Sequence, residues 1–468
     1  MNSIIKQLMD EVLDFYLNVE KSKVVPKAYS EELRAHLNAT YDFHERVPLD
    51  KLISDISWMM RQWTLHVTHP LYFGLYVPGV KMSSIIADTL VALYNPQLGS
   101  WSHAPAANEI EQFTLNYLLS QFGFNTDSCT ANFTTGGTEA NLSAVIVALT
   151  KAFPQYGDNG ILSLKSQPLI YLTEEAHNSF TKIAHITGLG RNSLRIIETD
   201  ESLKLDMNDL TKQLQEDKAL CYAPFLVVGT AGTTSAGVID PLPQLAEFCQ
   251  EHNLWFHVDA AYGGAAILSP RLKPFLTGIE LADSITCDAH KWFSVSMGAG
   301  MFFCKHKDAV TKAFRVVSPY MPGKSGDTID LYDTTIQCSR RFIGLKVFMC
   351  LAELGIDGFA EMIEHQVQMG IHLRKALKNS GWTIMNDTPL PVVCFTHEKI
   401  INQEVSPSNL LQLLYDSQRV WISETKLKNK IPVLRACITN FRTEKSDIDL
   451  LVTELDKAIT SQMEDKNY

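Results

Sequence analysis

The residue whose sequence context most clearly suggests chemistry is the lysine at position 291. It stands in the run DAHKW (288–292), directly after the apolar run 284–287. Desolvation and a neighbouring cation lower the pKa of an amine, which makes it nucleophilic enough to form imines. A lysine that merely extends from a strand end would have the same local sequence. The residues upstream of Lys291 favour the chemical interpretation.

An aspartate precedes this lysine by one strand–helix–strand step. Asp259 lies in the run FHVDAAYGG (256–264), at the end of an apolar strand candidate. A carboxylate in that place can keep the pyridine nitrogen of pyridoxal 5′-phosphate (PLP) protonated, so that the ring withdraws electrons from a substrate carbon. Asp259 could also cap the segment that follows. The small residues after it leave room for a flat ring and favour the cofactor.

Three further motifs could complete such a site. Gly137 and Thr138, in TTGGTEAN (134–141), open a helix candidate whose first backbone N–H groups can bind phosphate. His177, between a strand and a helix, can stack on a flat ring and contact a substrate carboxylate. Thr230, at the end of FLVVGT (225–230), can bind a ring oxygen or orient Asp259. An ordinary helix start, a hydrogen-bonded histidine and a turn are the alternatives.

The elements that must position these residues alternate between strands and helices from about 80 to 330. The strand candidates are LIYL (169–172), FLVVGT (225–230), LWFHVDAA (254–261) and SITCDAHKW (284–292). Such alternation predicts an α/β fold with a mostly parallel sheet covered on both faces. Ligands bind at the carboxyl ends of the strands in sheets of this kind, where the polar residues fall.

The two ends of the chain differ from this middle part. Residues 1–80 read as helices broken at Pro26, Pro48 and Pro70, a segment too short to form its own core. After 340, long helical stretches precede the strand candidates PVVCF (391–395), VWIS (420–423) and PVLRACI (432–438). We therefore predict an N-terminal helical segment (1–80) that packs on a dimer partner, a large cofactor domain (81–340) and a small C-terminal α+β domain (341–468).

Composition narrows the class of partner. The 468 residues include 41 basic and 52 acidic ones, a net charge of −11, which argues against nucleic acid or an anionic membrane as partner. None of the nine cysteines forms a C-x-x-C pair, so we expect reduced thiols and no metal site. No apolar run is long enough to span a bilayer, and the first residues do not resemble a signal peptide. We expect an unprocessed cytoplasmic protein.

Taken in order, the motifs resemble the group II PLP-dependent decarboxylases, the family of aromatic-L-amino-acid, glutamate and histidine decarboxylases. The matching runs are HPLYFG (69–74), TTGGTEAN (134–141), EEAHNS (174–179), GTAGTTSAG (229–237), HVDAAYGG (257–264), DAHKW (288–292), SRRF (339–342) and LRACITN (434–440). The resemblance implies the PLP-dependent fold-type I, like that of aspartate aminotransferase. It also implies a homodimer with active sites near the interface.

The resemblance assigns a role to each matching residue. Lys291 carries the Schiff base, Asp259 partners the pyridine nitrogen, and His177 and Ala261 cover the two faces of the ring. Thr230 supports the ring hydroxyl and Asp259. The phosphate-site residues are Gly137, Thr138, Asp288 and His290. The residues implied near the substrate are Tyr76, Pro78, His177, Arg340 (at the carboxylate) and Tyr320 (which protonates the substrate carbon).

The sequence departs from the family pattern around the substrate. Ala289 stands where many members have proline, Val77 replaces an aromatic residue, and Gly79 replaces a hydroxyl residue. Gln97 and Gly99 stand where apolar and aromatic pocket residues are expected. The substrate therefore stays open.

The predicted reaction is decarboxylation of an L-amino acid, with aromatic ones among the candidates, to its amine and CO2. Orientation selects the Cα–carboxylate bond over Cα–H. The alternatives are an acidic or diamino acid substrate, an aldehyde synthase or aminotransferase, and a degenerate paralogue that only binds. Tyrosine rather than phenylalanine at 320 argues against the oxidative reaction, and the retention of Lys291, Asp259 and His177 argues against the paralogue.

Overall fold

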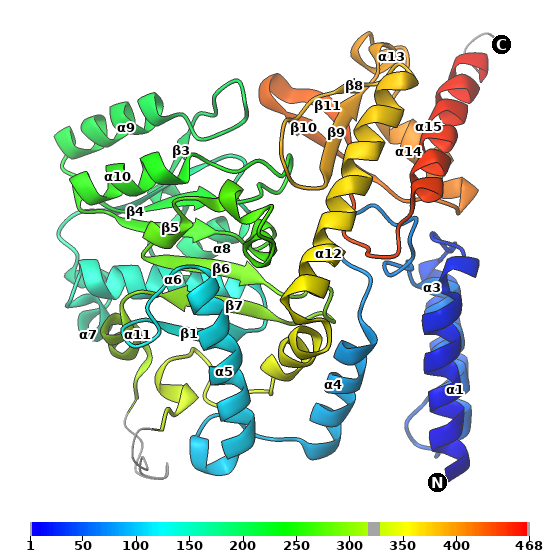
Figure 1. Ribbon diagram of the computed structural model, residues 1–468, viewed down its shortest axis with the longest axis horizontal. Coiled ribbons are helices and arrows are strands. Elements are labelled where there is room, and N and C mark those ends of the chain that lie inside the picture. The colour runs from blue at the N-terminus through cyan, green and yellow to red at the C-terminus, as the bar shows by residue number, and fades with distance from the viewer. Residues whose placement is uncertain (1, 317–327, 466–468) are drawn as a thin grey trace.

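The computed structural model describes residues 2–316 and 328–465 and contains a large and a small β-sheet (Figure 1). The strands of the large sheet are β1 (Thr130–Thr134), β2 (Pro168–Thr173), β3 (Leu194–Ile197), β4 (Ala223–Thr230), β5 (Trp255–Asp259), β6 (Ser284–Asp288) and β7 (Gly300–Cys304). Their order is β1-β7-β6-β5-β4-β2-β3, and only β7 runs antiparallel to its neighbours. The predicted mostly parallel sheet is confirmed.

Helices cover both faces of this sheet. They are α5 (Pro105–Gln121), α6 (Gly137–Ala152), α7 (Tyr156–Asn159), α8 (Ser179–Ile186), α9 (Met207–Ala219), α10 (Leu242–His252) and α11 (Lys307–Phe314). Side chains along a strand alternate between the faces. In β4, Val227 therefore joins the core beneath α9 and α10, whereas Leu226 and Val228 join the core beneath α6, α8 and α11. The two helix layers lie on opposite sides of the sheet in Figure 1.

The small sheet is antiparallel, in the order β10-β11-β9-β8. Its strands are β8 (Thr383–Ile384), β9 (Val392–Thr396), β10 (Ser423–Leu427) and β11 (Ile431–Cys437). The accompanying helices are α12 (Gly344–Asn379), α13 (Glu398–Ile401), α14 (Pro407–Ser417) and α15 (Lys445–Asp465). Helix α12 runs from the large sheet to the small one and is interrupted at Gly355, whose φ of 63° is left-handed.

One predicted strand is displaced along the chain. In the run 420–423, Val420 and Ile422 join the core of the small sheet, Trp421 forms an isolated bridge with Tyr72, and strand β10 begins at Ser423. Strand β10 has the polar sequence SETKL and lies at the edge of the sheet, where only one neighbour and little burial are needed. The sequence of β10 therefore gives little indication that it forms a strand.

Helices α1 (Asn2–Asn18) and α3 (Leu49–Trp63) lie at the edge of the molecule (Figure 1). Helix α2 (Ser30–Thr40) comes between them in the chain, so the predicted breaks at Pro26 and Pro48 are confirmed, and α4 (Met82–Tyr94) packs along α12. Helix α1 packs beside α3, yet it buries none of its own residues. Within the described ranges, none of the helices is both long and apolar enough to cross a membrane.

Candidate active site

The carboxyl ends of β1, β2, β4, β5 and β6 surround a cavity of about 330 Å³. Parallel strands place their carboxyl ends at one edge of a sheet, which explains why residues far apart in sequence meet there. The predicted site residues that line it are Tyr76, Gly137, Thr138, His177, Thr230, Asp259, Ala261, Asp288, His290 and Lys291. The cavity is thus the place where most of the predicted chemistry converges.

Lys291 lies in a turn just after β6, beside a buried carboxylate. Its Nζ is 3.3 Å from Oδ2 of Asp288, which is also 3.7 Å from Nε2 of His290. Burial lowers the pKa of His290, although the charge of Asp288 opposes this effect. The amine of Lys291 therefore points into the cavity with one ionic neighbour.

The turn that carries Lys291 is tied to the small sheet. The fully buried indole of Trp292 donates its Nε1–H to Oε1 of Gln366 on α12. Gln366 donates to the carbonyl of Thr439 (2.9 Å), and the Thr439 hydroxyl donates to the carbonyl of Val77 (2.9 Å). One hydrogen-bonded path therefore joins the lysine turn to the segment that contains Tyr76.

Asp259 ends β5 with its carboxylate buried and fixed on both oxygens. Oδ2 accepts a hydrogen bond from Nδ2 of Asn141 (2.9 Å), and Oδ1 accepts one from the backbone N–H of Ala261 (3.1 Å). These two bonds fix the orientation of the carboxylate at the cavity wall, where it can pair with a protonated ring nitrogen.

The start of α6 forms a cradle with two unsatisfied polar neighbours. Helix α6 begins at Gly137, and the first N–H groups of any α-helix have no intrahelical partner. A Cβ at Gly137 would lie 2.8 Å from Oδ2 of Asp288, so a larger residue there would displace that carboxylate. The buried hydroxyl of Thr230 and Oδ1 of Asp288 have no hydrogen-bond partner within the described chain. The free N–H groups of α6 suit an anionic group and the Thr230 hydroxyl suits a ring oxygen, as in PLP.

His177 follows β2 and is exposed toward the cavity. The backbone N–H of Ser179 donates to its Nδ1 (3.2 Å), which leaves Nε2 as the protonated nitrogen of the neutral ring. The surrounding protein lowers the pKa of His177 by desolvation, and the charge of Asp259 works in the opposite direction. A neutral imidazole can stack on a flat ring.

Aromatic residues form one wall of the cavity. The ring of Tyr76 stacks on Tyr262 at 3.9 Å and lies 4.6 Å from the guanidinium carbon of Arg435. Its hydroxyl donates to the carbonyl of Thr233 (2.8 Å), and its backbone takes a left-handed φ of 63°. Packing on three sides holds Tyr76 in this conformation, although a non-glycine residue is strained there.

Two of the predicted site residues lie elsewhere, and a third is not among the residues that the structure describes. Pro78 is buried outside the cavity lining. Arg340 is also buried away from it, with Nη1 2.8 Å from Glu111 and Nη2 2.8 Å from the carbonyl of Phe133. Tyr320 lies outside the described residues.

The cavity also contains residues that the sequence interpretation had not singled out. Asn141, Tyr262 and Met297 line it. Asn141 lies four residues after Gly137 on α6, and helical periodicity places such residues on one face. That spacing was a usable signal for Asn141, whereas nothing local marks Tyr262 or Met297.

Comparisons with known proteins agree with this geometry. A sequence model described as the pyridoxal-dependent decarboxylase conserved domain matches residues 31–398. An aromatic-L-amino-acid decarboxylase of Bacillus atrophaeus is 29% identical, over 98% of this chain and 95% of its own. A 4-hydroxyphenylacetaldehyde synthase of Rhodiola rosea is 25% identical, over 95% and 92%. The crystal structure of Oryza sativa TDC with PLP and tryptamine has the same fold, with a TM-score of 0.91, 23% identity and coverage of 99% and 98%.

Proposed function

Because the chain belongs to the pyridoxal-dependent decarboxylase family, we propose that this PLP-dependent amino acid decarboxylase acts on an aromatic L-amino acid and releases the amine and CO2. The observation that carries the proposal is the wall of Tyr76 and Tyr262 in the cavity that contains Lys291. Aromatic rings pack favourably on such a wall, whereas a charged side chain would lose its hydration there. The name of the Bacillus relative supports the same substrate class.

In this proposal Lys291 carries the cofactor on its amine, and Asp259 keeps the proton on the pyridine nitrogen. When bound, PLP withdraws electrons from the substrate α-carbon. The first N–H groups of α6, at Gly137 and Thr138, hold the phosphate. His290 adds a donor near the same cradle.

The remaining cavity residues would orient the ring. His177 and Ala261 cover its two faces, and the unsatisfied hydroxyl of Thr230 donates to the ring oxygen. Asp288 belongs to the site as the ionic neighbour of Lys291, since a carboxylate repels phosphate. This arrangement leaves the substrate between His177 and the Tyr76 wall.

Tyr320 is proposed to return the proton to the substrate α-carbon. A placed phenol can supply this proton as a general acid. The name of the Rhodiola relative points to aldehyde formation as the competing outcome, and the tyrosine at 320 favours the amine.

Arg340 receives a structural role in place of the predicted contact with the substrate carboxylate. Its guanidinium is 1% exposed and already pairs with a fully buried glutamate, Glu111. That glutamate also accepts the backbone N–H of Gly344, where α12 begins (2.8 Å). The pair therefore joins α5 to the start of α12.

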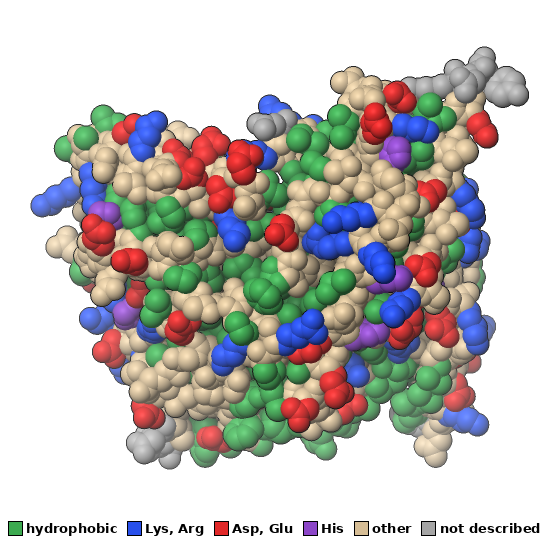
Figure 2. Space-filling view, turned by 45° about the horizontal axis from the view of Figure 1, so that its top comes forward, with side chains coloured by type: hydrophobic (Ala, Val, Ile, Leu, Met, Phe, Trp, Pro, Cys, Tyr) green, Lys and Arg blue, Asp and Glu red, His purple; other side chains and the backbone are tan. Residues whose placement is uncertain are grey.

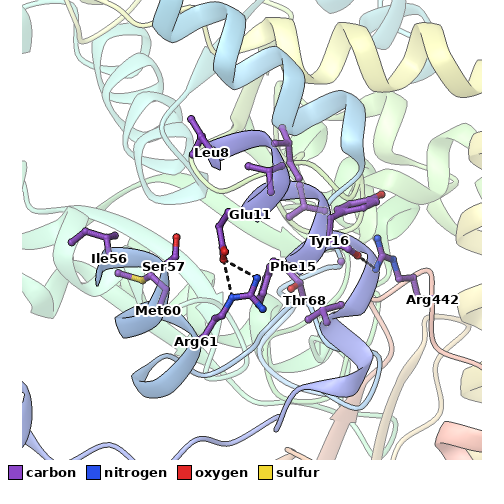
Figure 3. A pocket seen from close by; sticks show the side chains of 15 residues that line it. Leu8, Glu11, Phe15, Tyr16, Ile56, Ser57, Met60, Arg61, Thr68 and Arg442 are labelled. Carbon is purple, nitrogen blue, oxygen red and sulfur yellow. Dashed lines mark hydrogen bonds and ion pairs between the residues drawn. The ribbon is translucent and has the colours of Figure 1, made fainter. Parts of the chain in front are cut away.

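A homodimer is proposed because two apolar recesses lie open on the surface of the protomer. One, of about 350 Å³, lies between α1, α3 and the segment around Val80, with Arg61 and Glu11 paired across it (Figure 3). The other lies where α4 and α5 meet, next to the exposed side chains of Leu93 and Tyr94. Hydrophobic side chains also gather along the lower edge of the surface in Figure 2. Light scattering that gives a stable, active monomer would contradict the dimer.

A cytoplasmic location is also proposed. All nine cysteines lie among the described residues, and all are free thiols. Free thiols in this number suit a reducing compartment. Localisation of the tagged full chain tests the proposal.

Release of CO2 and formation of amine from a panel of L-amino acids test the proposed function. We expect turnover with tryptophan, tyrosine or phenylalanine, none with glutamate or 2,4-diaminobutyrate, and none with the Lys291→Ala variant. Preference for an acidic or diamino substrate would overturn the aromatic assignment. Tyr76→Ala should raise KM for the aromatic substrate because the substrate ring loses a surface to stack on.

A further inference from the structure

A chain of hydrogen bonds ends at the carboxylate of Asp259. Nε1 of Trp255 and Nδ1 of His257 both lie 2.8 Å from Oγ of Ser284. Nε2 of His257 lies 3.1 Å from Oδ1 of Asn141, whose Nδ2 donates to Oδ2 of Asp259 at 2.9 Å. His257 and Ser284 are fully buried, and Asn141 is 1% exposed.

Secondary structure brings these side chains together. Trp255, His257 and Asp259 are alternate residues of β5, so all three face the layer of α6. Ser284 on β6 is the register partner of His257 in the parallel ladder. Asn141 comes from α6, one turn after the Gly137 cradle. The same helix therefore contributes both the phosphate cradle and the contact to Asp259.

The donor and the acceptor of each hydrogen bond in this series can be assigned in one consistent way. The indole of Trp255 can only donate, so the Ser284 oxygen accepts from it. The carboxylate of Asp259 can only accept, so the amide of Asn141 presents its NH2 there and its oxygen to His257. Nε2 of His257 must then carry the proton, and Nδ1 accepts the hydroxyl hydrogen of Ser284. Burial lowers the pKa of His257 to about 4, which keeps the imidazole in this neutral form.

We propose that Asn141, His257 and Ser284 are positioning residues that hold the Asp259 carboxylate oriented toward the pyridine nitrogen of PLP. The inference rests on the proposed role of Asp259. Asn141 donates directly to Asp259 and also to the hydroxyl of Ser179 (3.3 Å). His257 supports this orientation of the amide by donating to its oxygen, and Ser284 fixes the tautomer of His257. His257 itself cannot exchange protons with a substrate, because it is fully buried behind Asn141.

The holoenzyme loaded with PLP that carries ¹⁵N at the pyridine nitrogen tests this chain. The ¹⁵N chemical shift reports protonation of the ring directly, and equilibrium dialysis gives the affinity for PLP. In Asn141→Ala we expect the shift to move toward that of the unprotonated ring. We also expect PLP to bind about tenfold more weakly, the scale set by one hydrogen bond to a charged group.

Variants of His257 separate a positioning role from general packing. His257→Gln can still donate to Asn141 and should stay near the wild-type shift. His257→Phe removes the donor to Oδ1 of Asn141, but Nδ2 keeps its bonds to Asp259 and to the hydroxyl of Ser179 (3.3 Å), so its change should be smaller than that of Asn141→Ala. Ser284→Ala should give the smallest change, since it acts through two further residues. Asn132→Ala is the matched control, because that buried asparagine has both ends of its amide bonded, to Thr334, and does not touch Asp259.

The outcomes are distinguishable. If Asp259→Ala itself leaves the ¹⁵N shift and PLP affinity unchanged, the proposed role of Asp259 fails. If Asp259→Ala changes both but Asn141→Ala and His257→Phe match the Asn132→Ala control, only the positioning chain is overturned. A graded change from Asn141→Ala through His257→Phe to Ser284→Ala supports it.

Discussion

Replacing Arg340 by leucine distinguishes a buried structural ion pair from a substrate contact. The guanidinium contacts Glu111 and the carbonyl of Phe133, and both side chains of the ion pair are at most 1% exposed. Removing one member of a buried pair leaves an uncompensated charge and costs about 3–5 kcal/mol. We therefore expect Arg340→Leu to lower the free energy of unfolding by about that amount.

The second variant makes the test decisive. The double variant Arg340→Leu/Glu111→Leu removes both charges and should recover most of the lost stability, since apolar replacement of a buried pair is often neutral. Recovery is incomplete, because the N–H of Gly344 also loses its acceptor. Urea unfolding midpoints of the wild type and the variants, with and without PLP, measure these effects. The reasoning is refuted if Arg340→Leu keeps wild-type stability, loses kcat/KM a hundredfold and is not rescued by the second change.

Four other predictions concern the site. Lys291→Ala should abolish turnover, and borohydride reduction of the wild type followed by peptide mapping should find the pyridoxyl adduct on Lys291 and on no other lysine. Asp259→Ala should bind PLP weakly and lose most activity, whereas a near-normal kcat would make Asp259 a mere cap. Tyr320→Phe should slow protonation by about 10²–10⁴-fold. In air, dissolved O2 can then act as the oxidant and be reduced to peroxide, while water supplies the oxygen of the aldehyde and ammonia is released. Amine alone at the wild-type rate would exclude Tyr320 as proton donor. The free energy of unfolding should fall by about 3 kcal/mol as pH drops from 6.5 toward 4, because His257 has a folded-state pKa of about 4. Urea unfolding at a series of pH values measures this loss, and His257→Gln should lack the part of it that comes from His257.

The elements that contain the chemistry were accessible from sequence because their signals are local. The apolar run of β5 followed by a single aspartate, and the glycines before α6, predict strand ends and a helix start without knowledge of the rest of the chain. Parallel strands then bring those ends together by geometry alone. Asp259 and Lys291 therefore meet in one cavity as expected.

The contacts between distant segments were not accessible in the same way. Arg340 and Glu111 lie 229 positions apart, and the run SRRF gives no indication that the arginine is neutralised behind the cavity. Asn141 and Asp259 are 118 positions apart, and the contact of His257 with Ser284 depends on the register of β5 against β6. Residue types and spacing predict where polar groups gather, but side-chain partners depend on packing across the whole fold.

The hydrogen-bonded path from Trp292 through Gln366 and Thr439 to Val77 has a consequence for redesign of the enzyme. The path joins the turn of Lys291 to the segment of Tyr76, so under the proposed function the residues for cofactor attachment and for substrate recognition are held by the same hydrogen bonds. Replacing pocket residues alone would leave that segment held in its present register. A library aimed at new substrates should therefore vary the wall and Gln366 together, with cofactor occupancy as a second selection beside product formation.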